Sequence, residues 1–298
     1  MFEKKSTWPD INLANHQEVY KYFGSEPYVT QYDGKPRIIS QATREVVECL
    51  YEPRIDYSVE TRQALQTMVE TEASALILVN HTSNHDPLLV SSAIRKEPSL
   101  ATVIDRSGLR IIAKDGMFRW FMMSRFCEAY QLVPAFRPVD YPGDSKENRL
   151  NLAHAAHGSV DTSVGYLKHG DGVLIFPEGK CNEHRTRVLQ IGSSAAKIVL
   201  DAQKTGVDNL NIICMGVSRG PRNRARSANV HIDCYPAAEL PNRLPQVVSF
   251  MQKGMQSAVD QAGLSYFSGS RQAGTYTEAR WLYLLGKLGV NPPEQLAA

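Results

Sequence analysis

A run of polar side chains between two apolar segments carries the residue types that acid–base chemistry needs. Residues 80–87 read Asn-His-Thr-Ser-Asn-His-Asp-Pro, after the apolar run 75–79 and before the apolar run 88–94. His81 and Asp86 lie five residues apart, so a tight turn can bring the carboxylate back to the imidazole. An imidazole that a carboxylate orients can take a proton from an alcohol near neutral pH. The segment therefore predicts a general base, His81, oriented by Asp86.

The flanking runs predict the elements that position this turn. Residues 75–79 are typical of a buried strand, and residues 86–96 of a helix that starts directly after the turn. Such strand ends are a frequent place for chemistry in α/β proteins. Asp86 followed by Pro87 is also typical of a helix N-cap with proline at the first helical position. A structural role, with Asp86 as the cap and His81 as an ordinary turn residue, is therefore the alternative to catalysis.

His85 raises a second alternative, because it lies four residues after His81 and beside Asp86. Histidine and aspartate side chains can bind a catalytic metal ion, which usually takes three protein ligands. The histidines at positions 154, 157 and 169 fall within the helical pattern of residues 146–169. A metal-dependent hydrolase would use His81, His85 and Asp86, whereas the acid–base interpretation predicts no metal.

A second motif follows another apolar run. Residues 172–175 predict a strand, and residues 176–179 read Phe-Pro-Glu-Gly. This block and the His-x-x-x-x-Asp spacing of residues 81–86 resemble the motifs of the glycerolipid acyltransferase superfamily, which includes glycerol-3-phosphate and 1-acylglycerol-3-phosphate acyltransferases. Either motif alone is short, but two in the family's order, each at a strand end, form a more specific pattern.

The resemblance implies an O-acyltransferase of phospholipid biosynthesis. The family's general base corresponds to His81 and not to His85, and its aspartate corresponds to Asp86. The implied reaction moves a fatty acyl group from acyl-CoA or acyl carrier protein to a hydroxyl of a glycerol-phosphate acceptor, with 1-acylglycerol-3-phosphate favoured. Glycerol-3-phosphate or another phospholipid or glycolipid acceptor stays open. No serine lies in a Gly-x-Ser-x-Gly turn, and Cys181 has only nearby cations to activate it, so we expect direct transfer without an acyl-enzyme intermediate. We expect no cofactor other than the acyl carrier as co-substrate.

Acceptor-binding roles are also implied for the residues after the second predicted strand. Glu178 and Gly179 correspond to the family's acceptor-binding pair, and Lys180 follows them. The family often continues with Thr-Arg, whereas here the basic residues are displaced to Arg185 and Arg187. These two resemble the phosphate-binding pair of the soluble glycerol-3-phosphate acyltransferases. Because of the displacement, a solvated surface loop is an almost equal alternative.

Arg137 is a further phosphate ligand that the resemblance implies. It follows the strand-like run 130–136, and a guanidinium group can donate two parallel hydrogen bonds to a phosphate. The glycine and aromatic pattern of that family motif is poorly kept here. Four more arginines within residues 219–226 predict contact with anionic lipid headgroups or with the phosphates of coenzyme A, or a solvated loop. Without interleaved aromatic residues they do not favour nucleic acid.

Apolar strand patterns alternate with helical patterns from residue 73 onward. This favours an α/β fold with a mostly parallel central sheet flanked by helices. Right-handed crossovers then place the loops after successive strands at one edge of the sheet. We expect strands near residues 75–80, 101–105, 129–134, 172–177, 210–217 and 228–234. We expect helices near residues 86–96, 116–126, 146–169, 192–205, 244–262 and 277–289.

Residues 1–72 are more polar and mostly helical in pattern, with helices expected near 18–24, 43–51 and from 58 onward. We expect an N-terminal helical cover over residues 1–72, packed on an acyltransferase domain of residues 73–298. A small separate N-terminal domain is the alternative.

The composition is that of an ordinary globular protein with a sizeable core: 298 residues, 43% hydrophobic and 21% charged, with a net charge of +2. Its five cysteines form no Cys-x-x-Cys pair, which is typical of free thiols in a reducing compartment. No run approaches the roughly 20 apolar residues that span a bilayer. We expect a cytoplasmic protein with peripheral contact to the inner membrane face, through residues 118–123 or a helix around Trp281. A non-catalytic lipid-binding protein is the remaining alternative.

Overall fold

The computed structural model describes residues 45, 49–114, 130, 132–137, 146–182, 186–219 and 226–269, without the side chains of residues 147–149, 151, 152 and 265–269. The helices expected near 18–24, 116–126 and 277–289 lie outside the described residues. So do both expected membrane-contact segments. Of the helix expected at 43–51, the described residues 45 and 49 are helical, whereas residue 50 lies in a turn and residue 51 is not helical.

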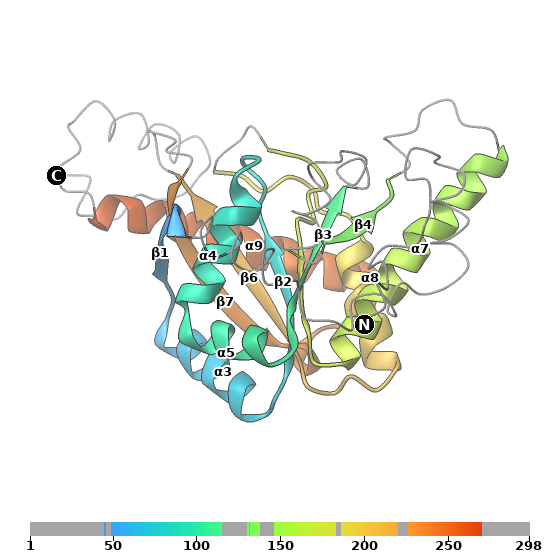
Figure 1. The fold of residues 1–298 in the computed structure, drawn as a ribbon, viewed down its shortest axis with the longest axis horizontal. Coiled ribbons are helices and arrows are strands. Elements are labelled where there is room, and N and C mark those ends of the chain that lie inside the picture. The colour runs from blue at the N-terminus through green and yellow to red at the C-terminus, as the bar shows by residue number, and fades with distance from the viewer. Residues whose placement is uncertain are drawn as a thin grey trace, which may run out of the picture.

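A seven-stranded sheet forms the centre of the described chain (Figure 1). Its order is β1-β7-β6-β2-β5-β3-β4, and all neighbouring pairs are parallel except β6 and β7. This confirms the expected α/β fold with a mostly parallel sheet. The strands are β1 (Glu52–Asp56), β2 (Ser74–Val79), β3 (Leu109–Lys114), β4 (Leu132–Ala135), β5 (Gly172–Ile175), β6 (Leu210–Ser218) and β7 (Ser227–Pro236).

Helices cover both faces of this sheet. They are α3 (Val59–Glu70), α4 (Asp86–Lys96), α5 (Pro98–Ser107), α7 (Lys146–Lys168), α8 (Ser194–Lys204) and α9 (Leu244–Gly269), with a short 3₁₀ helix η4 (Ala237–Glu239). Within the described residues, no helix combines the length and the apolar character that crossing a membrane requires.

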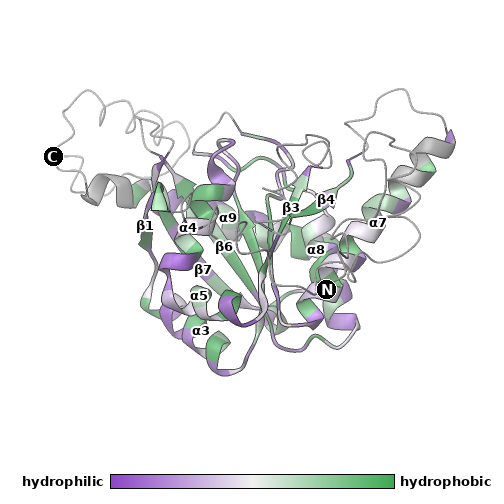
Figure 2. Cartoon of the chain, viewed as in Figure 1, coloured by the Kyte–Doolittle hydropathy of each residue, from purple (hydrophilic) through white to green (hydrophobic). Residues whose placement is uncertain are grey.

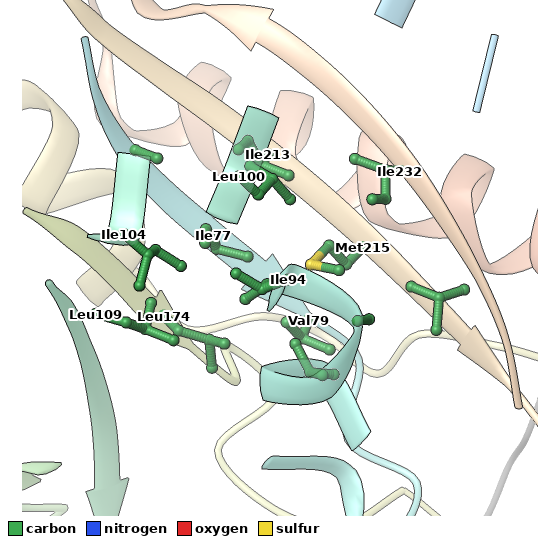
Figure 3. Packing of buried hydrophobic residues seen from close by; sticks show 14 of the residues in the cluster. Ile77, Val79, Ile94, Leu100, Ile104, Leu109, Leu174, Ile213, Met215 and Ile232 are labelled. Carbon is green, nitrogen blue, oxygen red and sulfur yellow. The ribbon is translucent and has the colours of Figure 1, made fainter. Parts of the chain in front are cut away.

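The two faces of β2 belong to two separate apolar cores. Ile77 and Val79 pack with residues of α3, α4 and α5, whereas Leu76 and Leu78 pack with residues of α7, α8 and α9. Part of the first core is shown in Figure 3. A strand covered on both faces needs apolar residues at every position, and all six residues of β2 are buried. The strongly hydrophobic colouring of the central strands in Figure 2 has this origin.

The strand predicted at residues 101–105 is wrong, because this segment lies within α5. Pro98 takes the first helical position, and the side chain of Glu97 accepts a hydrogen bond from the backbone N–H of Leu100 at 2.7 Å. The buried apolar residues of α5 recur at helical spacing. The strand in this region is β3, directly after α5, which the sequence interpretation missed.

The N-terminal part contributes a strand as well as a helix. Residues 52–56 form β1, which pairs in parallel with β7, although only helices were expected before residue 73. Helix α3 is present as predicted, and its Leu65 and Met68 are buried in the first core. Residues 52–70 are therefore part of the α/β unit. The division between residues 72 and 73 stays a prediction.

The connections after β2 and β5 leave the sheet on opposite faces. β2 continues into α4 on the first face, and β5 continues toward α8 on the second. The two strands are parallel neighbours, with Leu78 beside Ile175. Adjacent strands with opposite exits form a crevice at their carboxyl ends, where α/β proteins bind ligands.

Gly216 lets helix α9 lie directly on strand β6. A Cβ atom at this position would overlap the backbone of Ala258 and Val259 in α9. We expect Gly216→Ala to lower the free energy of unfolding by at least about 1–3 kcal/mol, because a helix backbone cannot move aside as a side chain can. Chemical denaturation measures this. Gly263→Ala is the control, since a Cβ there meets no atom within 4 Å, and equal stability of the two variants would contradict the prediction.

Candidate active site

Two strand ends that are distant in sequence meet at this crevice. The backbone N–H of His81, after β2, donates to Oε1 of Glu178, after β5, at 2.8 Å. The carbonyl of His81 accepts from the backbone N–H of Asn182 at 2.5 Å. The imidazole ring of His81 lies against the ring of Phe176, with the ring centroids 4.6 Å apart. The backbone of His81 is therefore fixed by the segment that contains the Phe-Pro-Glu-Gly motif.

The turn after β2 brings the carboxylate of Asp86 to the imidazole of His81. Asp86 Oδ2 lies 3.2 Å from His81 Nδ1 and accepts from the backbone N–H groups of Thr82 at 2.5 Å and Ser83 at 2.7 Å. The Asp86 side chain is fully buried, whereas 18% of the His81 side chain is exposed. One ring nitrogen is thus held by a fixed carboxylate, and the other, Nε2, is left for a second partner.

Asp86 is not the N-cap of α4. The cap position is occupied by His85, and Asp86 is the first helical residue, followed by Pro87. Its carboxylate accepts hydrogen bonds from the turn before the helix. The alternative in which Asp86 is the helix cap is therefore wrong about its position.

Glu178 uses both carboxylate oxygens within the protein. In addition to the bond from His81, its Oε2 accepts from Asn182 Nδ2 at 2.7 Å and from the backbone N–H of Leu189 at 2.8 Å. Burial raises the pKa of this carboxyl, and these hydrogen bonds oppose the rise. Glu178 therefore ties the two strand ends to the following loop. The acceptor contact that the resemblance implies for it stays a prediction.

We expect Glu178→Gln to lower the free energy of unfolding by about 1–3 kcal/mol at neutral pH. The reason is that an amide cannot accept from both Asn182 and Leu189 in addition to His81, so a buried donor loses its partner. Chemical denaturation of the wild-type protein and the variant measures the difference.

The same comparison tests the raised pKa of Glu178. A carboxyl whose pKa is higher in the folded state stabilises the fold fully below its ordinary pKa of 4.5, and that contribution is lost as pH rises through the folded-state pKa. The stability advantage of the wild type over Glu178→Gln should therefore shrink as pH rises above 4.5. A stability difference between the two proteins that does not change with pH would contradict a raised pKa of Glu178 in the folded state.

A cavity of about 890 Å³ adjoins His81. It also reaches the Phe-Pro-Glu-Gly segment and the side chains of β3, β4, β5, α7 and α8. Its size is within the usual range for ligand sites. Most of its lining is apolar and includes Ile111, Leu132, Phe136, Val160, Ile175, Phe176, Ile191, Ala195 and Ile198. The cavity can therefore hold an apolar group beside the imidazole of His81.

Four of the predicted substrate-binding residues, Arg137, Glu178, Gly179 and Lys180, line this cavity. Gly179 has a φ of +69°, a conformation that favours glycine, and a Cβ there would lie 3.5 Å from Nη1 of Arg137. The structure thus brings Arg137 to the glycine of the Phe-Pro-Glu-Gly motif. Arg187 is exposed and is not among the cavity residues, and Arg185 lies outside the described residues.

The side chains that a metal-dependent hydrolase would use, those of His81, His85 and Asp86, do not point to one common site. His85 Nδ1 lies 2.8 Å from the hydroxyl of Tyr51, whereas Asp86 faces His81. In the part of the chain that the structure describes, no group of three or more His, Cys, Asp and Glu side chains is arranged to hold a metal ion. The described residues therefore give no support to a metal-dependent hydrolase.

Cys181 lies beside the outer nitrogen of the His81 imidazole. Its Sγ is 3.2 Å from His81 Nε2 and 3.4 Å from Asn84 Oδ1, and the residue is exposed. Partial burial raises the pKa of this thiol, and the negative charges of Asp86 and Glu178 add to the rise. The thiol is therefore kept neutral beside this ring nitrogen.

Alkylation of Cys181 is expected to abolish the acyl transfer that the resemblance implies, because an added group on Sγ would occupy the space at His81 Nε2. Owing to the raised pKa, reaction with iodoacetamide should need more alkaline pH than reaction of an ordinary thiol. Cys181→Ala should protect the enzyme, whereas Cys49→Ala, which removes another exposed thiol, should not. The rate of thiol release before and after iodoacetamide treatment measures the loss of activity. If iodoacetamide inactivated Cys181→Ala as fast as the wild type, the prediction would be contradicted.

Three positioning residues were not identified from the sequence. Asn80 exchanges two hydrogen bonds with the backbone of Val217, at 2.7 and 3.1 Å, and so joins the ends of β2 and β6. Asn182 donates to Glu178, as described above. Arg219, expected to be a surface cation, is buried against Asp86. Each of these residues lies next to a strand end or within a few residues of a motif, which is the only signal the sequence carries for them.

The comparison with protein families supports the motif assignment. A family model described as Acyltransferase matches residues 58–218, a span that contains both motifs and more than half of the chain. A comparison with curated proteins found no match. The predicted resemblance is confirmed at the level of the family, and this chain belongs to the Acyltransferase family.

Proposed function

We propose that this acyltransferase moves a fatty acyl group from acyl-CoA or acyl carrier protein to a hydroxyl of 1-acylglycerol-3-phosphate, in phospholipid biosynthesis. Family membership supports acyl transfer as the reaction class. The proposal depends on one observation above all: the His81 imidazole, 3.2 Å from the Asp86 carboxylate, adjoins a mainly apolar cavity of about 890 Å³. A base at the edge of an apolar cavity suits substrates that combine a hydrocarbon chain with a reacting hydroxyl or thioester.

His81 is the general base in this mechanism. Its Nε2 takes the proton of the acceptor hydroxyl while the hydroxyl oxygen attacks the thioester carbonyl carbon. The C–S bond then breaks, and the imidazolium returns the proton to the departing thiolate, which leaves an ester and a thiol. Asp86 orients the ring through Nδ1 and stabilises the imidazolium. The acceptor hydroxyl has to displace the Cys181 thiol from Nε2 before it reacts.

Arg137 and Lys180 are the proposed ligands of the acceptor phosphate. Both line the cavity that adjoins His81. The guanidinium fork suits two phosphate oxygens, and Gly179 beside Arg137 allows a substrate to approach the backbone closely. We extend this role to Arg185 and Arg187 on the resemblance alone.

The donor and the acceptor are tested together with purified protein. Thiol release from palmitoyl-CoA is followed with 1-acylglycerol-3-phosphate, glycerol-3-phosphate, lysophosphatidylcholine or no acceptor, and the lipid products are identified by mass spectrometry. The proposal expects the highest rate with 1-acylglycerol-3-phosphate and formation of the diacyl product. Thiol release that does not depend on the acceptor would indicate thioester hydrolysis and would refute it.

Because the proposed acceptor is a membrane lipid, we also propose peripheral contact with the inner face of the membrane. Co-sedimentation with vesicles that contain phosphatidic acid, compared with neutral vesicles, tests this. If the same fraction of the protein sediments with both kinds of vesicle, the protein does not bind an anionic lipid surface in preference to a neutral one.

A further inference from the structure

Arg219 directly follows β6, the strand next to β2 in the sheet. The two strands are parallel, and the reciprocal hydrogen bonds between Asn80 and Val217 hold their carboxyl ends together. This pairing brings Arg219 to the turn after β2, although the two segments are far apart in the sequence.

The guanidinium group of Arg219 is buried against a buried carboxylate. Only 2% of its side chain is exposed, and its Nη1 forms an ion pair with Oδ1 of Asp86. The same nitrogen donates to Thr82 Oγ1 at 2.8 Å. The two carboxylate oxygens therefore have different partners: Oδ1 faces Arg219, and Oδ2 faces His81 Nδ1 and two backbone N–H groups.

The permanent charge of Arg219 lies in contact with this buried carboxylate. A buried carboxylate with no cation nearby either takes up a proton itself or keeps its imidazole partner protonated. In both cases the His81–Asp86 pair would already hold the proton that it has to take from a substrate, so it could not act as a base. A guanidinium group is always charged, so Arg219 offsets the negative charge of Asp86 at every working pH.

We propose that Arg219 is a positioning residue of the catalytic pair: its permanent charge offsets that of the buried Asp86 carboxylate and holds the carboxylate in a fixed orientation against the His81 imidazole. This inference rests on the roles proposed above for His81 and Asp86. It gives Arg219 a task different from the phosphate or headgroup contact expected of the arginines at 219–226.

Other titratable groups also face the pair. The Glu178 carboxylate accepts from the His81 backbone, the Cys181 thiol lies at Nε2, and His85 is on the same turn with Tyr51 against it. Burial raises the pKa of Glu178, of Cys181 and of Tyr51. None of these three groups can supply positive charge, and an imidazole such as that of His85 is charged only when it is protonated. Among the residues that the structure describes, Arg219 is the permanent cation that forms an ion pair with Asp86.

The direct test is an NMR titration of the His81 imidazole, which needs no substrate. We expect Arg219→Met to raise the His81 titration midpoint by about 1–3 pH units, and Arg219→Lys, which keeps the charge, to raise it much less. Arg110→Met is the matched control. It breaks another buried ion pair, Arg110–Asp171 at 2.8 Å, near the amino ends of the strands, and it should leave the His81 midpoint unchanged.

Activity provides the second measurement. The acid limb of the kcat/KM profile should move to higher pH together with the His81 midpoint. At a fixed pH below the midpoint, the rate should therefore fall about tenfold for each pH unit by which the midpoint rises. The KM values for both substrates should change little. A merely structural role would lower the amount of folded enzyme without moving the acid limb.

If Arg219→Met does not fold, the double variant Asp86→Asn/Arg219→Met takes its place. Removing both charges of a buried pair costs much less than removing one, so the double variant should be more stable than either single variant. An unchanged His81 midpoint in folded Arg219→Met, or a double variant no more stable than the single variants, would overturn the inference. Wild-type protein that titrates as expected but transfers no acyl group would refute the proposed function instead.

Discussion

Replacing His81 with alanine is expected to lower the kcat of acyl transfer by about 10²–10⁴-fold, the usual contribution of a positioned general base. The substitution should leave the fold intact, because the contacts that join the two strand ends use the backbone of His81. Its N–H donates to Glu178 and its carbonyl accepts from Asn182, and alanine retains both groups. Steady-state thiol release with the preferred acceptor measures the loss.

The KM values and the melting temperature provide the controls for His81→Ala. Both should change little, since the proposed role of the imidazole is in the transition state and alanine keeps the backbone contacts of residue 81. His85→Ala, on the same turn but bonded to Tyr51, is the matched variant and should retain far more activity. Wild-type turnover in His81→Ala would remove the mechanism proposed here.

Asp86→Asn is expected to have an effect of similar or larger size, for two reasons that can be measured separately. An amide no longer stabilises the imidazolium and can hold the ring in the wrong tautomer, which in serine proteases lowers kcat by about 10⁴-fold. The substitution also leaves the buried guanidinium of Arg219 without its counter-charge. Breaking a buried ion pair in this way costs about 3–5 kcal/mol of stability. Kinetics and chemical denaturation follow the two effects.

Asp171→Asn distinguishes the catalytic effect of Asp86→Asn from the loss of stability. Asp171 forms the buried pair with Arg110, with 6% of its side chain exposed. Its replacement should destabilise the protein to a similar degree but leave the kcat of the folded fraction close to that of the wild type. Equal losses of kcat in the two variants would show that Asp86 acts only through stability.

Local patterns in the chain were enough to predict the class of the fold and the proposed catalytic pair. The continuous apolar runs at residues 75–79 and 172–175 specify buried strands, because strands covered on both faces need apolar residues at every position. The spacing of His81 and Asp86 fits within one turn, and local spacing is readable without a structure. The Phe-Pro-Glu-Gly block at residues 176–179 was recognisable for the same reason. The helical spacing within residues 98–107 was equally local, but it was misinterpreted as a strand.

The neighbours of each strand, and the groups that surround the pair, follow from the three-dimensional arrangement alone. Nothing in the pattern of β2, β5 and β6 states that β2 lies between the other two, because an apolar run reports burial and not the identity of its neighbours. That order gives Glu178 its bond to the His81 backbone and delivers Arg219 to Asp86. An arginine after an apolar strand has the same local pattern whether it faces solvent or a buried carboxylate. Its role therefore depends on contacts between segments more than a hundred residues apart, which the sequence of either segment does not contain.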